Sequence, residues 1–320
     1  ATGRCGTGDM ASPVTRVVAI GECMLELSAA GDAWRMGYAG DTFNTALYLA
    51  RLGVPVAYLS ALGTDPFSAE MRAAFRAERI DDSLVLSDPK RLPGLYAIRT
   101  DARGERSFHY WRERSAVRNL FVLEGIEEAL AEAAAADLLY LSGITLSLVD
   151  ASGRERLREL AAAVRRRGGT VAFDPNYRPA GWVDPDAARA AFADFAGEID
   201  TALPTFDDER LLWGDAVIAD CIARWRGWGA KDIVVKLGSE GCALATEEGF
   251  VPVRGERVEQ VVDTTGAGDS FNAAYLAARL QGEDRAAAAA AGNRLAAEVI
   301  QVRGAIMPRD RWAATAKERR

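Results

Sequence analysis

Short, almost wholly apolar runs alternate along the chain with longer stretches of helical periodicity. The runs have the length and composition of buried strands at residues 17–22, 56–63, 137–143, 170–176, 201–205 and 232–238. Several are apolar nearly throughout, as expected for strands that are covered on both faces. Because helical patterns lie between them, the alternation predicts an α/β fold with a doubly wound, mostly parallel central sheet flanked by helices.

Two of the helical patterns have visible ends. Residues 44–52 carry apolar side chains at helical spacing and stop at Gly53. Residues 152–167 begin with Ser152 and Glu155 at the spacing of a capping box, and they end in arginines followed by glycine. Cations and then glycine are typical of a helix C-terminus.

Two regions interrupt the alternation. Residues 23–40 contain strand-like pieces with no helix between them, and residues 95–112 read as a hairpin around residues 101–104. We expect about 23–40 and 93–114 to form a small β-sheet, a lid, outside the main sheet. The remainder of 14–320 is expected to be one domain. Residues 1–13 are expected to be a disordered leader, since residues 1–9 lack the apolar segment of a secretory signal.

Composition excludes several classes of protein. The 320 residues carry a net charge of -7, which argues against non-specific nucleic-acid binding. No apolar run reaches the ~18 residues of a membrane span. The single histidine, His109, gives little support to a histidine-based metal site or a Ser-His-Asp triad. Four scattered cysteines are expected to be buried thiols in a reduced cytoplasm.

The stretch 263–280 places Gly266, Ala267 and Gly268 directly before Asp269, at the start of an amphipathic helical pattern. The first turn of a helix leaves backbone N–H groups unpaired, and small residues let such donors converge on a phosphoryl group. A carboxylate beside that anion can take a proton from an attacking hydroxyl. We therefore interpret the three small residues as an anion hole and Asp269 as a catalytic base. The alternative is a plain helix cap.

The string DTTGAGDSF at 263–271 resembles the C-terminal signature of the ribokinase-like (PfkB) carbohydrate kinases. Residues 39–53 resemble the glycine-rich sugar-binding signature of that family, with Ala39 where the pattern usually has a first glycine. Further stretches resemble a subgroup that phosphorylates 2-keto-3-deoxy sugar acids, at 61–68, 91–116, 139–147, 173–182 and 203–209. The resemblance covers roughly residues 15–308 and implies a ribokinase-like fold with a sugar acid and ATP as substrates.

On the sugar side, the resemblance implies that Gly40, Asp41 and Asn44 belong to a clamp on sugar hydroxyls. The two polar residues also open a helix, and aspartate is a common N-cap. Both readings of Asp41 and Asn44 stay open at this point.

The lid carries the residues that would recognise an acid. Phe108, Tyr110 and Arg112 share one face by the two-residue period of a strand. Arg112 and Arg178 can each offer a fork of donors to a carboxylate, which a neutral sugar would not need. The resemblance places both arginines, with Tyr96 and Tyr110, around the keto-acid end of the substrate. The alternatives are an ordinary aromatic sheet surface and, for Arg178, a surface loop.

On the nucleotide side, the resemblance implies ATP-binding roles after a late strand and on a late helix. The residues concerned are Lys236, Gly238, Ser239, Gly241, Gly266, Gly268 and Asn293. A plain hairpin turn is the alternative for Ser239.

Phosphoryl transfer requires the charge of the triphosphate to be neutralised, usually by Mg²⁺ that keeps several waters. The family often uses an Asn-x-x-Glu motif, which corresponds here to Thr205 and Asp208, or to Glu209 if the register slips by one. The metal ligands are therefore unknown: Asp208 and Glu209 could hold the ion through water or only cap a helix. Relatives also carry a monovalent cation such as K⁺ near the positions of Asp263 and Thr265, and the sequence leaves this open.

These residues together predict an enzyme that phosphorylates the terminal C6 hydroxyl of a keto-deoxy sugar acid. A kinase for the galactonate epimer, fructose or ribose and a non-catalytic sugar-acid-binding protein stay open as alternatives. A dehydrogenase has less support, because the glycine string lies late in the chain and Phe271 breaks the GxGxxG pattern. The exposed edges of the lid sheet favour a homo-oligomer formed through the lid.

Overall fold

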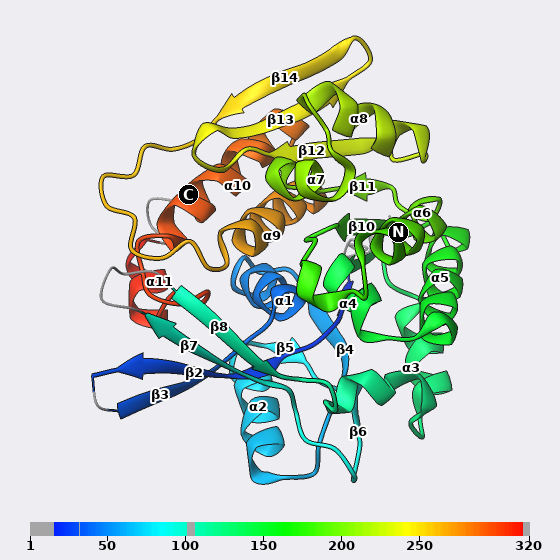
Figure 1. Ribbon diagram of the computed structural model, residues 1–320, viewed down its shortest axis with the longest axis vertical. Helices are drawn as coiled ribbons and strands as arrows, with labels where there is room; N and C mark the ends of the chain where they lie inside the picture. The colour runs from blue at the N-terminus through cyan, green and yellow to red at the C-terminus, as the bar shows by residue number, and fades with distance from the viewer. Residues whose placement is uncertain (1–15, 32, 101–105, 316–320) are drawn as a thin grey trace, which may run out of the picture.

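A computed structural model describes residues 16–31, 33–100 and 106–315. The expected leader at 1–13 and the turn at 101–104 lie outside these residues. A ten-stranded sheet forms the centre of the molecule, in the order β14-β13-β12-β11-β10-β9-β1-β4-β5, with β6 also paired to β4 (Figure 1). The strands from β12 to β5 are parallel, and β13 and β14 add an antiparallel hairpin at one edge.

Six of the ten strands begin within one residue of an apolar run of the sequence, although the strand at 201–202 is shorter than its run, and the strands at 80–81, 85–87, 241–246 and 249–254 have no predicted run. The ten strands have these bounds. They are β1 (Val17–Ile20), β4 (Val56–Leu62), β5 (Ile80–Asp81), β6 (Val85–Ser87), β9 (Leu138–Ser142), β10 (Thr170–Asp174), β11 (Thr201–Ala202), β12 (Asp232–Lys236), β13 (Gly241–Thr246) and β14 (Gly249–Arg254).

Helices cover both faces of the sheet, because alternate residues of each strand point to opposite sides. In β1, Val17 and Ala19 belong to one buried cluster, and Val18 and Ile20 belong to the other. The first cluster lies under α1 (Asp41–Arg51), α2 (Pro66–Ala77), α9 (Ala267–Leu280) and α10 (Arg285–Val299), with Trp312 of α11 (Arg309–Thr315) at its margin. The second lies under η1 (Ala116–Val122), α3 (Ile126–Ala133), α4 (Gly143–Leu148), α5 (Ala151–Arg166), α6 (Pro185–Ala196), α7 (Phe206–Trp213) and α8 (Ile218–Gly227).

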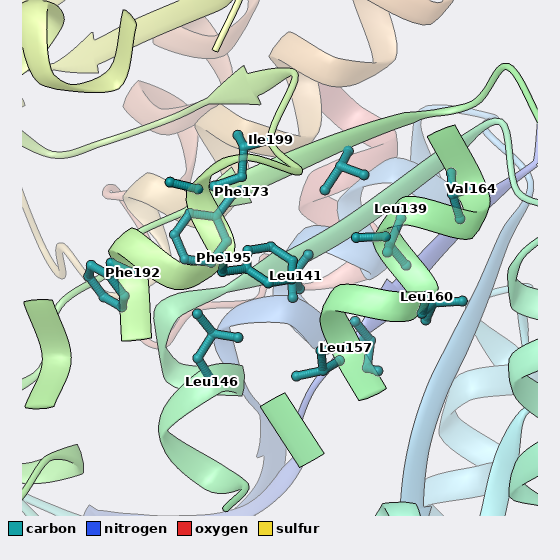
Figure 2. Packing of buried hydrophobic residues seen from close by; sticks show 14 of the residues in the cluster. Leu139, Leu141, Leu146, Leu157, Leu160, Val164, Phe173, Phe192, Phe195 and Ile199 are labelled. Atoms are coloured by element: carbon teal, nitrogen blue, oxygen red, sulfur yellow. The ribbon is translucent and has the colours of Figure 1, made fainter. Parts of the chain in front are cut away.

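Figure 2 shows part of the second cluster. Leu139 and Leu141 of β9 and Phe173 of β10 lie beneath the apolar faces of α5 and α6. Phe173 contacts Phe192 edge-on, with ring centroids 5.7 Å apart. This packing fixes the end of β10, from which several residues of the site follow.

A separate four-stranded sheet, here called the lid sheet, has the order β3-β2-β7-β8. Its strands are β2 (Met24–Ala30), β3 (Ala33–Ala39), β7 (Leu95–Thr100) and β8 (Arg106–Trp111). β2 pairs with β7 in parallel, and the other pairs are antiparallel. The two interrupting regions of the sequence therefore form one small sheet, which projects beside the main body in Figure 1.

Two helices are capped differently from the sequence-based prediction. α1 begins at Asp41 after Gly40, and no side chain caps it. α5 begins at Ala151, and its cap is Asp150, whose side chain accepts a bond from the Gly153 amide at 2.8 Å. The Ser152–Glu155 capping box does not form, because an aspartate two positions earlier already caps the helix.

Within the described part of the chain, no helix combines the length and the apolar character needed to cross a bilayer. Cys23, Cys221 and Cys242 are buried free thiols, as expected.

Candidate active site

A pocket of about 510 Å³ lies between the lid sheet and the carboxyl edge of the parallel strands. Open α/β sheets bind ligands at this edge. The predicted residues that line the pocket are Gly40, Asp41, Asn44, Tyr96, Tyr110, Arg112, Arg178, Asp208, Lys236, Gly266, Gly268 and Asp269. Most of the proposed sugar and phosphoryl residues are thus brought together from both ends of the chain.

Asp269 lies in the first turn of α9, directly opposite the start of α1. Asn44 Nδ2 donates to Asp269 Oδ2 at 2.8 Å, and the Thr45 hydroxyl donates to the Asp269 backbone carbonyl at 3.2 Å. Burial, reinforced by the negative charge of Asp41, raises the pKa of Asp269 to about 8. The Asn44 bond acts in the opposite direction, because it favours the ionised form. The carboxylate can therefore exchange a proton near neutral pH.

The turn before Asp269 needs glycine for two reasons. Gly266 has a φ of 77°, and a Cβ there would lie 2.8 Å from the Ala305 Cβ and carbonyl oxygen. A Cβ on Gly268 would meet only Lys236 Nζ, at 3.5 Å, so this glycine leaves open space beside a cation. The Ala267 N–H already donates to the Thr264 carbonyl at 3.2 Å. This engaged amide weakens the expectation that Ala267 donates to a bound phosphoryl group.

Asp41 is not a helix cap. Its carboxylate accepts a hydrogen bond from Asn176 Nδ2 at 3.1 Å and lines the pocket. The approach of α1 depends on Gly40, because a Cβ there would lie 2.0 Å from the Glu22 carbonyl oxygen. The cap interpretation of Asp41 is therefore wrong, and its side chain is directed to the site.

Several residues in the pocket or directly behind it were missed from the sequence, among them Asp174, Asn176, Glu22 and Asn272. Asp174 at the end of β10 binds Lys236 Nζ and Asn272 Nδ2, both at 2.6 Å. Asn176 follows two residues later, and Glu22 follows β1. A signal existed for Asp174, Asn176 and Glu22, since each is a polar residue at the carboxyl end of a predicted strand, within 170–176 or 17–22. Asn272 lies on the buried face of α9, where nothing in the pattern separates it from the core.

Arg112 and Arg178 both reach the pocket, and each has an acidic partner of its own. Arg112 Nη2 pairs with the buried Glu22 carboxylate at 2.5 Å, and the Arg112 guanidinium lies 5.9 Å from the Tyr110 ring centre. Arg178 Nη1 pairs with Asp208 at 3.0 Å. The Arg112 side chain is 18% exposed and the Arg178 side chain 55%, so Arg112 is the more firmly held.

The aromatic face of the lid sheet is formed as the period predicts. Tyr96, Phe108 and Tyr110 line the pocket together, with the Tyr96 and Tyr110 ring centres 5.7 Å apart. The Tyr96 hydroxyl donates to Glu26, and burial with this nearby carboxylate raises the pKa of Tyr96. Tyr96 is therefore a fixed, neutral wall of the pocket.

Asp208 and Glu209 face different surroundings. Asp208 lines the pocket, whereas Glu209 is 1% exposed and pairs with Arg224 at 2.6 Å, away from the site. Glu209 also accepts a bond from the Trp225 indole at 3.1 Å. Glu209 as a metal ligand of the site is therefore wrong, and the register that gives Asp208 is the one consistent with the structure.

The other proposed nucleotide residues do not line this pocket. Gly238 and Ser239 are exposed in η3 (Gly238–Glu240). Gly241 has a φ of 98°, and a Cβ there would lie 2.2 Å from the Val253 carbonyl oxygen. The packing of β13 against β14 is therefore sufficient to explain why this position is glycine. Asn293 Nδ2 donates to the Val253 and Arg254 carbonyls at 3.2 and 3.0 Å.

Residues 14–312 match the family described as pfkB family carbohydrate kinase. The 2-dehydro-3-deoxygluconokinase of Escherichia coli strain K12 is 44% identical over 304 residues, which is 92% of this chain and 98% of the relative. The protein of the same name from Dickeya dadantii strain 3937 is 42% identical over 299 residues, 91% of this chain and 96% of the relative.

Solved structures share the fold. The PfkB protein from Polaromonas sp. JS666 has a TM-score of 0.80 at 30% identity and covers 94% of this chain and 99% of its own. The fructokinase from Vibrio cholerae O395, in its fructose, ADP and calcium ion bound form, has a TM-score of 0.81 at 25% identity and covers 94% and 98%. The ribokinase-like α/β fold predicted from the sequence is confirmed, and the chain belongs to the pfkB family of carbohydrate kinases.

Proposed function

We propose that the protein transfers the γ-phosphoryl group of ATP to the C6 hydroxyl of 2-keto-3-deoxy-D-gluconate and forms 2-keto-3-deoxy-6-phosphogluconate. One observation carries the proposal: a single pocket is lined by a carboxylate beside a glycine-opened helix start and also by two arginines. The 2-dehydro-3-deoxygluconokinases at 42–44% identity support the same substrate.

Asp269 is the proposed general base. Asn44 fixes its Oδ2 at 2.8 Å, so the other oxygen, Oδ1, is the one available to a substrate hydroxyl. As that hydroxyl attacks phosphorus, Asp269 accepts its proton. The start of α9 and the Lys236 ammonium provide positive potential where charge gathers on the phosphoryl oxygens.

Arg112, Arg178 and Tyr110 are proposed to bind the carboxylate and keto group of the sugar acid, with Tyr96 as a wall beside them. Asp41 and Asn44 then face the sugar hydroxyls from α1. Closure of the lid sheet would exclude water and suppress hydrolysis of ATP. The acid end and the reacting end of the substrate are thereby held at opposite sides of one pocket.

The pocket also fits a hard cation. When bound, Mg²⁺ would neutralise the triphosphate, and the Asp208 carboxylate on the pocket wall offers the oxygen that this ion prefers, directly or through water. A monovalent cation such as K⁺ near Asp263 and Thr265 belongs to the same proposal. Gly238, Ser239, Gly241 and Asn293 are proposed to lie along the nucleoside part of ATP.

We place the enzyme in the cytoplasm and propose a homo-oligomer formed through the lid sheet. Trp34, Met36 and Trp111 are 43–59% exposed on that sheet, and a second copy would cover them.

An ADP-release assay with Mg-ATP tests the proposal against 2-keto-3-deoxygluconate, its galactonate epimer, gluconate, fructose and ribose. We expect the keto-deoxy acids to be preferred over the neutral sugars. A preference for fructose or ribose would mean that the two arginines do not select an acid. Turnover of none of the five would remove the sugar assignment.

A further inference from the structure

Asp174, the last residue of β10, is a buried carboxylate at the floor of the pocket and is 3% exposed. Its Oδ2 accepts hydrogen bonds from Lys236 Nζ and Asn272 Nδ2, both at 2.6 Å. Its Oδ1 accepts a bond from the Asn176 backbone N–H at 3.1 Å. One carboxylate therefore fixes groups on β12, on α9 and in the loop after β10.

Two of these groups contact different parts of the pocket lining. Lys236 Nζ lies 3.5 Å from the place that a Cβ on Gly268 would occupy, beside the start of α9. Asn176 is held at a φ of 36°, which asparagine tolerates better than most residues, and its Nδ2 donates to Asp41 at 3.1 Å. Lys236 thus faces the phosphoryl side, and Asn176 faces the sugar side.

The ammonium group has a donor to spare. A lysine ammonium has three N–H donors. Asp174 Oδ2 takes one and Asn272 Oδ1, at 3.2 Å, takes a second. The third remains for a ligand in the pocket that Lys236 lines. Because Lys236 is only 6% exposed, its buried charge needs a close partner, and the Asp174 carboxylate provides one.

We infer that Asp174 is the positioning residue of this site: it holds Lys236 as a catalytic residue against the transferred phosphoryl group, and it holds Asn176 against Asp41. The inference rests on the proposed function. It assigns the binding of the phosphoryl group to the Lys236 ammonium and assigns to Asp174 a role in both halves of the pocket without contact to either substrate.

Variants of the ion pair test the inference through separate effects on kcat and KM. Lys236→Met should lower kcat about 100-fold or more, the usual loss for one preorganised donor to developing charge, with little change in the KM of the sugar acid. Asp174→Asn should lower kcat and also raise the sugar-acid KM, because the single amide oxygen can accept from Lys236 or from the Asn176 N–H but not from both. The matched control is Lys231→Met, at an exposed lysine outside the pocket, which should keep both constants.

The double variant Asp174→Asn/Lys236→Met removes both buried charges and protects against a failure of Asp174→Asn to fold. Its kcat should be no lower than that of Lys236→Met, since the effect of Asp174 on kcat acts through Lys236. The inference would be overturned if the kcat losses of the two single variants multiplied in the double variant. A kcat near wild type for Lys236→Met would also overturn it.

A binding measurement separates this inference from the identity of the sugar. Calorimetry without any sugar compares Mg-ADP with Mg-AMP-PNP, which carries a third phosphoryl group. Lys236→Met should weaken AMP-PNP about tenfold or more relative to ADP, as expected for loss of a charge-assisted hydrogen bond. Equal effects on the two nucleotides would overturn the placement of Lys236, whereas failure of every sugar acid as a substrate would overturn only the proposed function.

Discussion

Asp269 and Asn44 stand 225 residues apart in the sequence, yet Asn44 Nδ2 donates to Asp269 Oδ2 at 2.8 Å. The bond joins the first turns of α9 and α1, so the base and the sugar side share one rigid contact. It favours the ionised carboxylate, whereas burial and the charge of Asp41 favour the protonated one. The pKa of about 8 is the balance of these opposing effects.

That balance predicts the pH dependence of the reaction. A base must be deprotonated to act, so kcat/KM should fall as the pH decreases below about 8 and level off above it. Asn44→Ala should move this limb to higher pH, because the bond that favours the charged form is lost. Asp41→Asn should move it to lower pH, because a repelling charge is lost. Profiles of kcat/KM from pH 5.5 to 9.5 check the two directions. If the acidic limb moved by the same amount in the same direction in both variants, this account of the Asp269 pKa would be contradicted.

The buried pair of Glu22 and Arg112 predicts a coupled loss of stability and of acid recognition. Arg112→Ala leaves the Glu22 carboxylate, 3% exposed, without this partner and should lower the free energy of unfolding by about 3 kcal/mol. It should also raise the KM of the sugar acid far more than that of ATP. Urea unfolding and steady-state kinetics measure the two effects.

The double variant Glu22→Gln/Arg112→Met is the control for that loss. It removes both charges, so most of the stability should return while the KM for the sugar acid stays high. If the KM for the sugar acid were unchanged in both variants, Arg112 would have no place in the site.

Asp208 and Glu209 form a matched adjacent pair for testing the metal. Asp208→Asn should raise the Mg²⁺ concentration required for half-maximal activity, because Asp208 lines the pocket. Glu209→Gln should leave that concentration unchanged and lower the melting temperature, because Glu209 pairs with Arg224 in the core. Magnesium titrations at saturating ATP and thermal melts separate the two effects. If Glu209→Gln raised the Mg²⁺ requirement and Asp208→Asn did not, Glu209 would be the metal ligand and this account of the site would be contradicted.

The glycines before Asp269 should respond differently to alanine. Gly266→Ala should destabilise the fold, since φ is positive there and a Cβ would lie 2.8 Å from Ala305. Gly268→Ala should leave stability near wild type but weaken Mg-ATP binding, because the added methyl enters open space beside Lys236. Thermal melts and nucleotide calorimetry measure the two effects; equal melting temperatures for both variants would contradict this account of the turn.

The central sheet, its flanking helices and most of the pocket residues could be predicted from the sequence, because all of them depend on local patterns. Apolar runs such as 56–63 mark the parallel strands, and the two-residue period places Phe108 and Tyr110 on one face of the lid sheet. The helix starts were less accurate: Asp150 caps α5 instead of Ser152, because neighbouring polar residues compete for the same role.

Ion pairs between residues that lie far apart in the sequence could not be predicted from it. Asp174 meets Lys236 because β10 and β12 both end at the carboxyl edge of the main sheet, whereas Glu22 meets Arg112 because β1 of the main sheet ends close to the end of β8 of the lid sheet. Arg178, in the loop after β10, pairs with Asp208 in the first turn of α7. No local spacing encodes these contacts, so the sequence does not reveal that each arginine is already paired with an acidic residue.

The central claim is that Asp269 removes the proton from the C6 hydroxyl, and Asp269→Asn tests it most directly. The measurement is the rate of ADP release with Mg-ATP and 2-keto-3-deoxygluconate, with binding of the sugar acid followed by calorimetry. The account predicts a kcat lower by about 10³-fold or more with binding kept within a fewfold, since general bases contribute roughly 10²–10⁴. A kcat near that of the wild type would contradict it.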